Sequence, residues 1–293
     1  MGNKLNKKAY PLYLLVPAVV VYSVFIIIPF LFSIFFSLTD WNIERMFTPV
    51  FRGVTNYLTV LQDKIFVRAV VNTLLFAVGT TILKIAFGLL LALAVLKVSR
   101  LNNVLRTIFY IPCVMSPLII GVIFTSILAD QGLLNNLLES LGLSALAVNW
   151  LAKYATAMSS VIMIEGWMWS GFNMFIFIAG LQAISTDYYE SADVDGVSKF
   201  NQFRYITLPL LVPSFTVTVT LNITGSLKVF DLIYVLTQGG PGFDTQVMST
   251  YVYRAFGLGL LGESSAASVI LAVIVVLISF VLNRYLTRKE VAL

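Results

Sequence analysis

The chain has 293 residues, of which 59% are apolar and only 11% are charged, and its mean hydropathy is +0.92. These values lie outside the range of soluble globular domains, so lipid is the expected solvent. The absence of histidine excludes histidine-based catalysis and most zinc sites, and the one cysteine, Cys113, excludes an intrachain disulfide. The net charge of +5 is small and gives no reason to expect nucleic-acid binding. We therefore expect no catalytic residues and no metal site.

Six apolar segments are long enough to cross a membrane as helices, which takes roughly 20 residues for about 30 Å of hydrocarbon. The first follows several lysines, as a signal peptide does, but it is too long and lacks a clear cleavage site, so we interpret it as a retained span. The sequence thus predicts an all-α polytopic membrane protein, with one six-helix domain over residues 12–286 and no soluble domain large enough for an enzyme. The spans are expected at residues 12–37, 70–96, 107–129, 155–182, 208–236 and 264–286.

Prolines within these spans predict kinks or helix ends, because proline lacks a backbone donor and clashes with the preceding turn. They are Pro29, Pro112, Pro117, Pro209 and Pro213.

Basic residues determine the orientation, since they concentrate in cytoplasmic connections. They gather before the first span, between the second and third spans, and at the end of the chain: Lys4, Lys7, Lys8, Lys97, Arg100, Arg106, Arg284, Arg288 and Lys289. An even number of spans places both termini on one side. We therefore predict a cytoplasmic N-terminal segment over residues 1–11 and a cytoplasmic tail over residues 287–293.

The connection between the fourth and fifth spans is polar and also falls on the cytoplasmic side. Its pattern predicts a short helix pair around the turn Asp195-Gly196, with Ser198 capping the second helix. Phe200 and Phe203, three residues apart, are suited to fill a groove of a partner. The alternative is an ordinary amphipathic loop that lies on the membrane surface.

The same connection carries a family resemblance. Glu190-Ser191-Ala192-x-x-Asp195-Gly196, followed by Phe203-x-x-Ile206-Thr207-Leu208-Pro209-Leu210, resembles the EAA motif of permease subunits of ABC importers. The chain departs from the motif at Ser191 and Val197, where the family prefers alanine. We call residues 187–206 the EAA segment.

Other stretches resemble the carbohydrate branch of this family, the maltose- and oligosaccharide-type permeases. The resemblance covers nearly the whole chain from about residue 55, and Ser185 stands where the family often has proline. The matching stretches are Gly180–Ile184, Phe230–Tyr234, Leu236–Pro241, Arg106 with Pro112, and Gly132 with Asn135.

The resemblance implies a type I ABC importer permease fold and a role in sugar or oligosaccharide import through the plasma or inner membrane of a prokaryotic cell. The EAA segment would dock on a cytosolic ATPase through Glu190, Ser191, Ala192, Asp195, Gly196, Phe200 and Phe203. The chain has no Walker sequence and is expected to hold no cofactor, so ATP and magnesium would be bound by the ATPase. The implied partners are a second permease, two ATPase copies, an extracytoplasmic solute-binding protein, lipid and a sugar substrate.

Polar and small residues form a stripe near the middle of the predicted fifth span, where polar side chains usually face a bundle interior or a watered cavity. The resemblance implies that this stripe and part of the fourth span contact the substrate, through Asn222, Gly225, Ser226, Val229, Met168, Trp169 and Phe172. The alternative is helix packing through small residues. The glycine-rich loop 238–242 is either close to the binding-protein surface or a simple turn.

Four charges fall within or near the spans. We hypothesise that Lys84, where the family usually has a neutral residue, and Glu165 neutralise one another or face a common cavity; otherwise each reaches water separately. Lys228 and Asp231 are three residues apart on the predicted fifth helix, which favours a structural pair over a substrate gate.

Two other functional classes compete with the ABC importer. An ion-gradient-driven secondary transporter would use the four charges as a relay, but the inverted repeats expected of that class are not visible in the sequence. An intramembrane enzyme is disfavoured, because histidine is absent and no acidic cluster lies within the spans.

Overall fold

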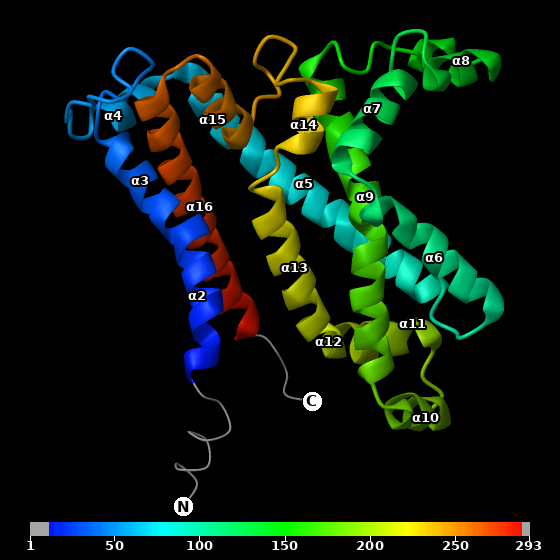
Figure 1. Cartoon of the computed structure of the whole chain (residues 1–293). Coiled ribbons are helices and arrows are strands. Elements are labelled where there is room, and N and C mark those ends of the chain that lie inside the picture. The colour runs from blue at the N-terminus through cyan, green and yellow to red at the C-terminus, as the bar shows by residue number, and fades with distance from the viewer. Residues whose placement is uncertain (1–11, 289–293) are drawn as a thin grey trace, which may run out of the picture. The chain divides into compact units, whose positions relative to one another are not determined.

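Helices form the regular structure of the chain (Figure 1). The computed structural model describes residues 12–288, and within that range it contains no strand, only one isolated bridge between Thr39 and Phe51. The all-α prediction is confirmed for these residues. The predicted N-terminal segment 1–11 and residues 289–293 of the predicted tail lie outside the described range.

The chain divides into two units. The first comprises residues 12–63 and 252–270 and contains η1 (Leu12–Leu15), α2 (Val16–Tyr22), the π-helix η2 (Ser23–Ile27), α3 (Ile28–Ser37) and α4 (Thr55–Gln62). The second comprises residues 64–251 and 271–288 and contains α5 (Lys64–Ala94), α6 (Arg100–Val114), α7 (Pro117–Ile127), α8 (Leu133–Ser140), η3 (Ser144–Leu146), α9 (Tyr154–Ala183), α10 (Thr186–Val194), α11 (Lys199–Gln202), the π-helix η4 (Phe203–Thr207), α12 (Leu208–Leu210), α13 (Val212–Ser226) and α14 (Asp231–Leu236). Helices α15 (Met248–Gly257) and α16 (Leu261–Thr287) continue from one unit into the other.

The core of the second unit is the pairing of α5 with α9, which are 31 and 30 residues long and pack along each other. Phe76 on α5 and Met168 and Phe177 on α9 are fully buried there. Helix α13 packs mainly on α5, and α6 packs on α9. Helices α5, α9 and α13 therefore surround the polar residues described below.

The third predicted span is broken rather than merely kinked. Helices α6 and α7 meet at an angle of 94°, and Pro117 is the first residue of α7. The Ser116 side chain accepts a hydrogen bond from the backbone N–H of Leu118 at 3.3 Å and so caps the new helix. The kink or helix end expected at Pro117 is confirmed, because the Ser116 cap and Pro117 together start a separate helix within the predicted span 107–129.

The fifth predicted span, residues 208–236, is also not one helix. A bend of 62° separates residues 199–210 from α13, consistent with the prolines at 209 and 213, and α13 ends at Ser226. Residues 227 and 228 form a turn, and residues 229 and 230 have no regular structure before α14 begins at Asp231. An acidic first residue favours a new helix start, because it opposes the positive end of the helix dipole.

That break overturns the expectation that Lys228 and Asp231 are paired on one helix. Lys228 follows α13, Asp231 begins α14, and the structure contains no ion pair between these two residues. Ser226 is correspondingly the last residue of its helix and does not lie near the middle of a span.

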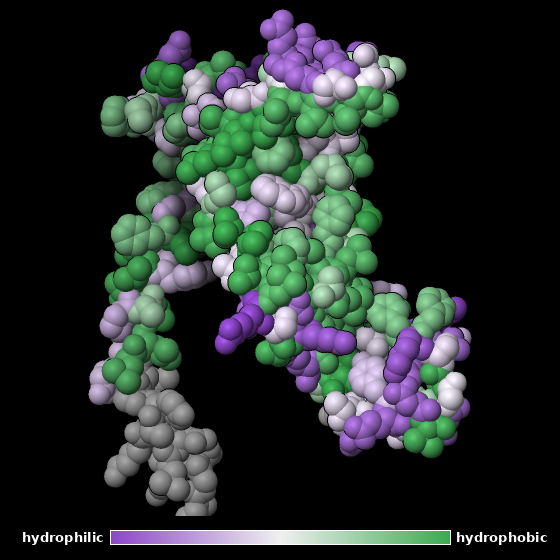
Figure 2. All heavy atoms as spheres, turned by 90° about the vertical axis from the view of Figure 1, so that its right-hand side faces the viewer, coloured by the Kyte–Doolittle hydropathy of each residue, from purple (hydrophilic) through white to green (hydrophobic). Residues whose placement is uncertain are grey.

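Four described helices are long and apolar enough to cross a membrane, and up to six spans result if each bent pair counts as one. The face of the molecule drawn in Figure 2 carries a broad apolar surface, and hydrophilic side chains gather toward its two ends. Exposed apolar residues on α6 and α7 contribute to such a surface, among them Val104, Ile108, Ile111, Ile119 and Val122. Exposed apolar helices of this length are typical of a protein surrounded by lipid.

The close approach of α9 and α6 supplies a first prediction. A Cβ atom on Gly171 would overlap the backbone carbonyl of Phe109, and a backbone cannot move aside as a side chain does. We expect Gly171→Ala to destabilise the protein by about 1–3 kcal/mol, as overpacking does, and to lower the midpoint of thermal unfolding in detergent. Gly225→Ala is the matched control, because a Cβ there meets no atom within 4 Å; equal midpoints for the two variants would contradict the packing argument.

Candidate functional site

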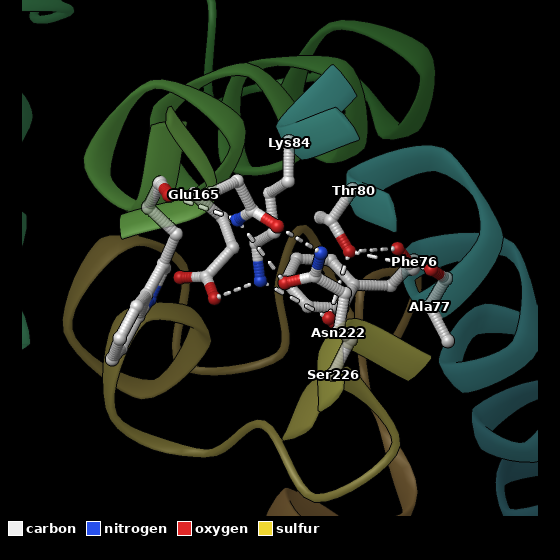
Figure 3. Close-up of polar contacts among 9 residues, drawn as sticks. Phe76, Ala77, Thr80, Lys84, Glu165, Asn222 and Ser226 are labelled. Carbon is white, nitrogen blue, oxygen red and sulfur yellow. Dashed lines mark hydrogen bonds and ion pairs between the residues drawn. The ribbon is translucent and has the colours of Figure 1, made fainter. Parts of the chain in front are cut away.

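An ion pair lies inside the second unit, where α5, α9 and α13 meet (Figure 3). The ammonium of Lys84 on α5 is 2.8 Å from Oε1 of Glu165 on α9, and both side chains are buried. Lys84 also donates a hydrogen bond to Oγ of Ser226 at 3.2 Å. The hypothesis that the two charges neutralise one another is confirmed.

Neighbouring polar side chains extend this pair into a buried polar cluster, which comprises Thr80, Lys84, Glu165, Asn173, Asn222 and Ser226. The Thr80 hydroxyl is within hydrogen-bond distance of both Oγ of Ser226, at 2.9 Å, and the carbonyl oxygen of Phe76, at 2.7 Å. The amides of Asn173 and Asn222 bond to each other, with Nδ2 of Asn222 donating at 2.7 Å and Nδ2 of Asn173 donating at 3.4 Å. The cluster therefore joins three helices through hydrogen bonds rather than through apolar packing alone.

Two cavities adjoin the cluster. The first, of about 270 Å³, is lined by Lys84, Glu165, Trp169, Phe172, Leu221, Asn222 and Gly225. The second, of about 200 Å³, shares three of these residues and is lined by Pro117, Glu165, Met168, Trp169, Gly225, Lys228, Val229, Phe230, Asp231 and Leu232. Both combine aromatic surfaces with charged and amide groups, as sites for small polar molecules do.

The residues predicted to contact substrate gather at these cavities. Trp169 and Gly225 line both of them, Phe172 and Asn222 line the first, and Met168 and Val229 line the second. Ser226 lines neither cavity but bonds to Lys84 and Thr80. The structure thus brings the seven residues together, while their contact with a substrate stays a prediction.

Aromatic geometry adds a feature useful for binding. The rings of Trp169 and Phe172 meet edge to face, with centroids 6.0 Å apart and planes at 90°. The ammonium of Lys84 lies 5.8 Å from the centre of the Trp169 ring, close enough for a cation–π interaction. Two perpendicular rings offer apolar surfaces of different orientation to a bound molecule.

Sequence reasoning missed Thr80 and Asn173. Both were visible in principle, because Thr80 is one helical turn before Lys84 and Asn173 is one turn after Trp169. Neither stood out, since threonine is common in membrane helices and a single asparagine does not reveal its partner.

The EAA segment forms the predicted helix pair. The Ser185 side chain caps α10 by accepting a hydrogen bond from the backbone N–H of Asp187 at 3.3 Å. The Ser198 side chain caps α11 by accepting a hydrogen bond from the backbone N–H of Asn201 at 3.4 Å. Between them Gly196 has a φ of 72°, a conformation that glycine adopts without strain. The prediction of two short helices around this turn is confirmed.

Asp193 ties the two short helices together. Its carboxylate accepts from the Lys199 ammonium at 2.7 and 2.9 Å and also from the Gln202 amide. The hydrogen bond from Lys199, followed by that from Gln202, holds the pKa of Asp193 below its usual range. The carboxylate is therefore ionised at neutral pH and keeps the pair closed.

The residues predicted to contact an ATPase differ in exposure. Glu190, Ser191, Asp195, Gly196 and Phe200 are exposed and Phe203 is half-buried. Ala192 is buried at 7% exposure, and its carbonyl accepts the N–H of Val197 at 2.9 Å. The Ala192 side chain therefore packs within the helix pair, and contact of these residues with an ATPase stays a prediction.

The long apolar helices are those of a multi-pass membrane protein. Residues 84–290 match the family described as binding-protein-dependent transport system inner membrane component, and the chain belongs to this family.

Relatives and solved structures agree with this assignment. The chain is 36% identical to the probable ABC transporter permease protein YurN of Bacillus subtilis (strain 168), over 97% of this chain and 99% of the relative. It is 36% identical to the trehalose/maltose transport system permease protein MalF of Thermococcus litoralis, over 89% of this chain and 88% of that one. A chain of a bacterial alginate ABC transporter, crystallised with an alginate pentasaccharide-bound periplasmic protein, is similar with a TM-score of 0.83, 26% identity and coverage of 98% and 97%. A second structure, of an importer of the acidic polysaccharide alginate, has a TM-score of 0.81 at 27% identity, over 97% of this chain and 98% of that one.

The ion pair yields a stability prediction. Lys84→Met and Glu165→Gln each leave one buried charge without its counter-ion, which typically costs about 3–5 kcal/mol. The double variant Lys84→Met/Glu165→Gln removes both charges, so we expect it to lose less than the sum of the single variants when thermal unfolding of the purified protein is measured. Strictly additive losses would mean that the two charges do not stabilise each other.

Proposed function

We propose that the chain is the membrane-spanning subunit of an ATP-driven importer, and that it forms the pathway for a sugar or oligosaccharide. The observation that carries this proposal is the pair of cavities between α5, α9 and α13, lined by Trp169, Phe172 and Asn222. Aromatic rings offer flat apolar surfaces to sugar faces, and amide and carboxylate groups accept or donate hydrogen bonds to hydroxyls. Relatives named for trehalose and maltose, lactose and starch degradation products support the substrate class.

We infer six spans, each bent helix pair counting as one, with both termini in the cytoplasm of a prokaryotic cell and the chain in its plasma or inner membrane. The packing near the EAA segment supports this orientation. Leu96 and Leu105, which flank the basic connection between α5 and α6, belong to the same apolar cluster as Ile184 and Tyr189. The basic connection and the EAA segment therefore share one end of the second unit, and basic connections favour the cytoplasmic side.

The EAA segment is proposed to couple the permease to a cytosolic ATPase that binds ATP and magnesium. Its exposed residues supply a charged contact through Glu190 and an apolar one through Phe200, which is 69% exposed. Hydrogen bonds from Lys199 and Gln202 to Asp193 link α10 to α11, which supports the movement of the two helices as one element. Nucleotide-driven closure of the ATPase would then rock the spans between inward-open and outward-open states.

The proposed partners are a second permease, a dimer of the ATPase and an extracytoplasmic solute-binding protein. The similar solved chain was crystallised with a substrate-loaded periplasmic protein, which supports the last of these. The loop that follows α14 is proposed as the surface for the binding protein, because α14 packs with α7 and the start of α9, away from the EAA segment (Figure 1).

An ion-gradient-driven transporter is not favoured. Such a relay needs charges that exchange partners or protons along a path. Lys84 and Glu165 are committed to each other, and Lys228 and Asp231 are not joined to them by any ion pair in the described residues.

Uptake measurements test the proposed function. The chain is expressed with its partner permease, ATPase and binding protein, and the purified complex is placed in proteoliposomes with ATP inside the compartment that holds the ATPase. We expect accumulation of at least one of maltose, trehalose and lactose that stops on ATP depletion and persists after addition of a protonophore. Accumulation that persists without ATP but stops with the protonophore would support the secondary transporter instead.

The turn of the EAA segment supplies a separate prediction about coupling. Gly196→Val forces a β-branched residue to a φ of 72°, although a Cβ there meets no atom within 4 Å, so the effect comes from backbone strain alone. We expect the ATPase to co-purify poorly with this variant and transport to fall at least tenfold. Gly196→Asn is the matched control, because asparagine tolerates positive φ; the proposal loses its support if both variants retain the ATPase equally.

A further inference from the structure

The charges around the two cavities balance. The residues that line them include two cations, Lys84 and Lys228, and two anions, Glu165 and Asp231. Their formal charges sum to zero, so the cavities present no net charge to a molecule within them. This balance bears on which class of saccharide the pathway accepts, an inference that rests on the proposed function.

The Lys84 ammonium has little left to offer a substrate. Its side chain is only 4% exposed. It contacts Glu165 at 2.8 Å, Ser226 at 3.2 Å and the face of the Trp169 ring at 5.8 Å. An ammonium has three donors, and Glu165 and Ser226 accept hydrogen bonds from two of them. A substrate carboxylate would therefore compete with Glu165 for this ammonium.

Glu165 is placed differently. Only its Oε1 atom accepts a hydrogen bond from a described residue, and Glu165 lines both cavities. The second oxygen can accept a hydrogen bond from a hydroxyl, while the ion pair with Lys84 carries no net charge. Hydrogen bonds from hydroxyls to a carboxylate are stronger than those to a neutral acceptor.

We propose that the Lys84–Glu165 pair selects uncharged saccharides at the first cavity, whose charged lining residues are these two: Glu165 accepts hydrogen bonds from their hydroxyls, and the mutual neutralisation denies acidic or basic sugars an unpaired counter-ion there. Burying a charge without a counter-ion is costly, whereas hydroxyls that find acceptors are tolerated. The similar importer of an acidic polysaccharide shows that this fold is compatible with anionic cargo. The charge class is therefore set by side chains such as these rather than by the fold.

Unpairing one charge at a time tests the proposal. Glu165→Gln leaves the Lys84 ammonium as an uncompensated cation beside the first cavity. Binding of the trianionic trisaccharide trigalacturonate to the assembled importer complex is measured by titration calorimetry, without the binding protein. We expect at least tenfold tighter binding by Glu165→Gln than by the wild type. Equal affinity in the two complexes would overturn the proposal.

Removing the positive charge instead, with Lys84→Gln, tests the proposal with a cationic ligand. This test remains informative if the Glu165→Gln complex does not assemble. Lys84→Gln leaves the Glu165 carboxylate uncompensated, so the complex should bind triglucosamine, a cationic trisaccharide, at least tenfold more tightly than the wild type does. The proposal is wrong if triglucosamine binding is unchanged in an assembled Lys84→Gln complex.

The double variant Lys84→Met/Glu165→Gln is the control, because it has neither charge and should gain affinity for neither trisaccharide. A gain in the double variant would assign the effect to a widened cavity instead of to charge. Failure of this proposal is distinguishable from failure of the proposed function. The latter is the absence of ATP-dependent saccharide uptake by the wild type, whereas the former is an unchanged charge preference in a complex that does import saccharide.

Discussion

A polar group inside a membrane helix must find a partner within the protein, because lipid provides none. This constraint organises the second unit. Lys84 and Glu165 come from helices that are the longest in the chain, and each lies where the other helix can reach it. Because a buried charge without its partner is destabilising, the ion pair fixes the register of α5 against α9. The amide pair of Asn173 and Asn222 does the same for α9 against α13.

The same constraint explains where helices are interrupted. Breaks expose backbone groups that need water or side chains, so within a membrane they are tolerated where protein or a cavity surrounds them. The bend before Pro117 and the break after Ser226 both border the second cavity, which is lined by Pro117 and Val229. The irregular backbone and the open space therefore occur together. A pathway for a polar molecule has the same requirement, because the molecule also needs partners within the hydrocarbon region.

Much of the architecture was predictable from local signals in the sequence. Hydropathy located the spans, prolines 117 and 209 marked breaks, and the Asp195-Gly196 turn with Ser198 marked the helix pair of the EAA segment. What failed was continuity. The stretch around Lys228 and Val229 is apolar enough to look helical, yet α13 ends at Ser226 and residues 227–230 are a turn followed by irregular backbone. Hydropathy reports burial in lipid and says nothing about whether backbone hydrogen bonds continue.

The two charge pairs show why a site is harder to predict than a fold. Lys228 and Asp231 are three residues apart and would be neighbours on a continuous helix, but α13 ends before Lys228 and α14 begins at Asp231. Lys84 and Glu165 are 81 residues apart and yet form a contact of 2.8 Å. Whether two residues that are close in sequence contact each other depends on the backbone conformation between them, which one turn can change. The distant pair rests instead on the cost of leaving two charges unpaired between apolar helices, and that cost does not depend on any single turn. For buried charges in a membrane protein, the energy of isolation is therefore a better guide to partners than spacing along the chain.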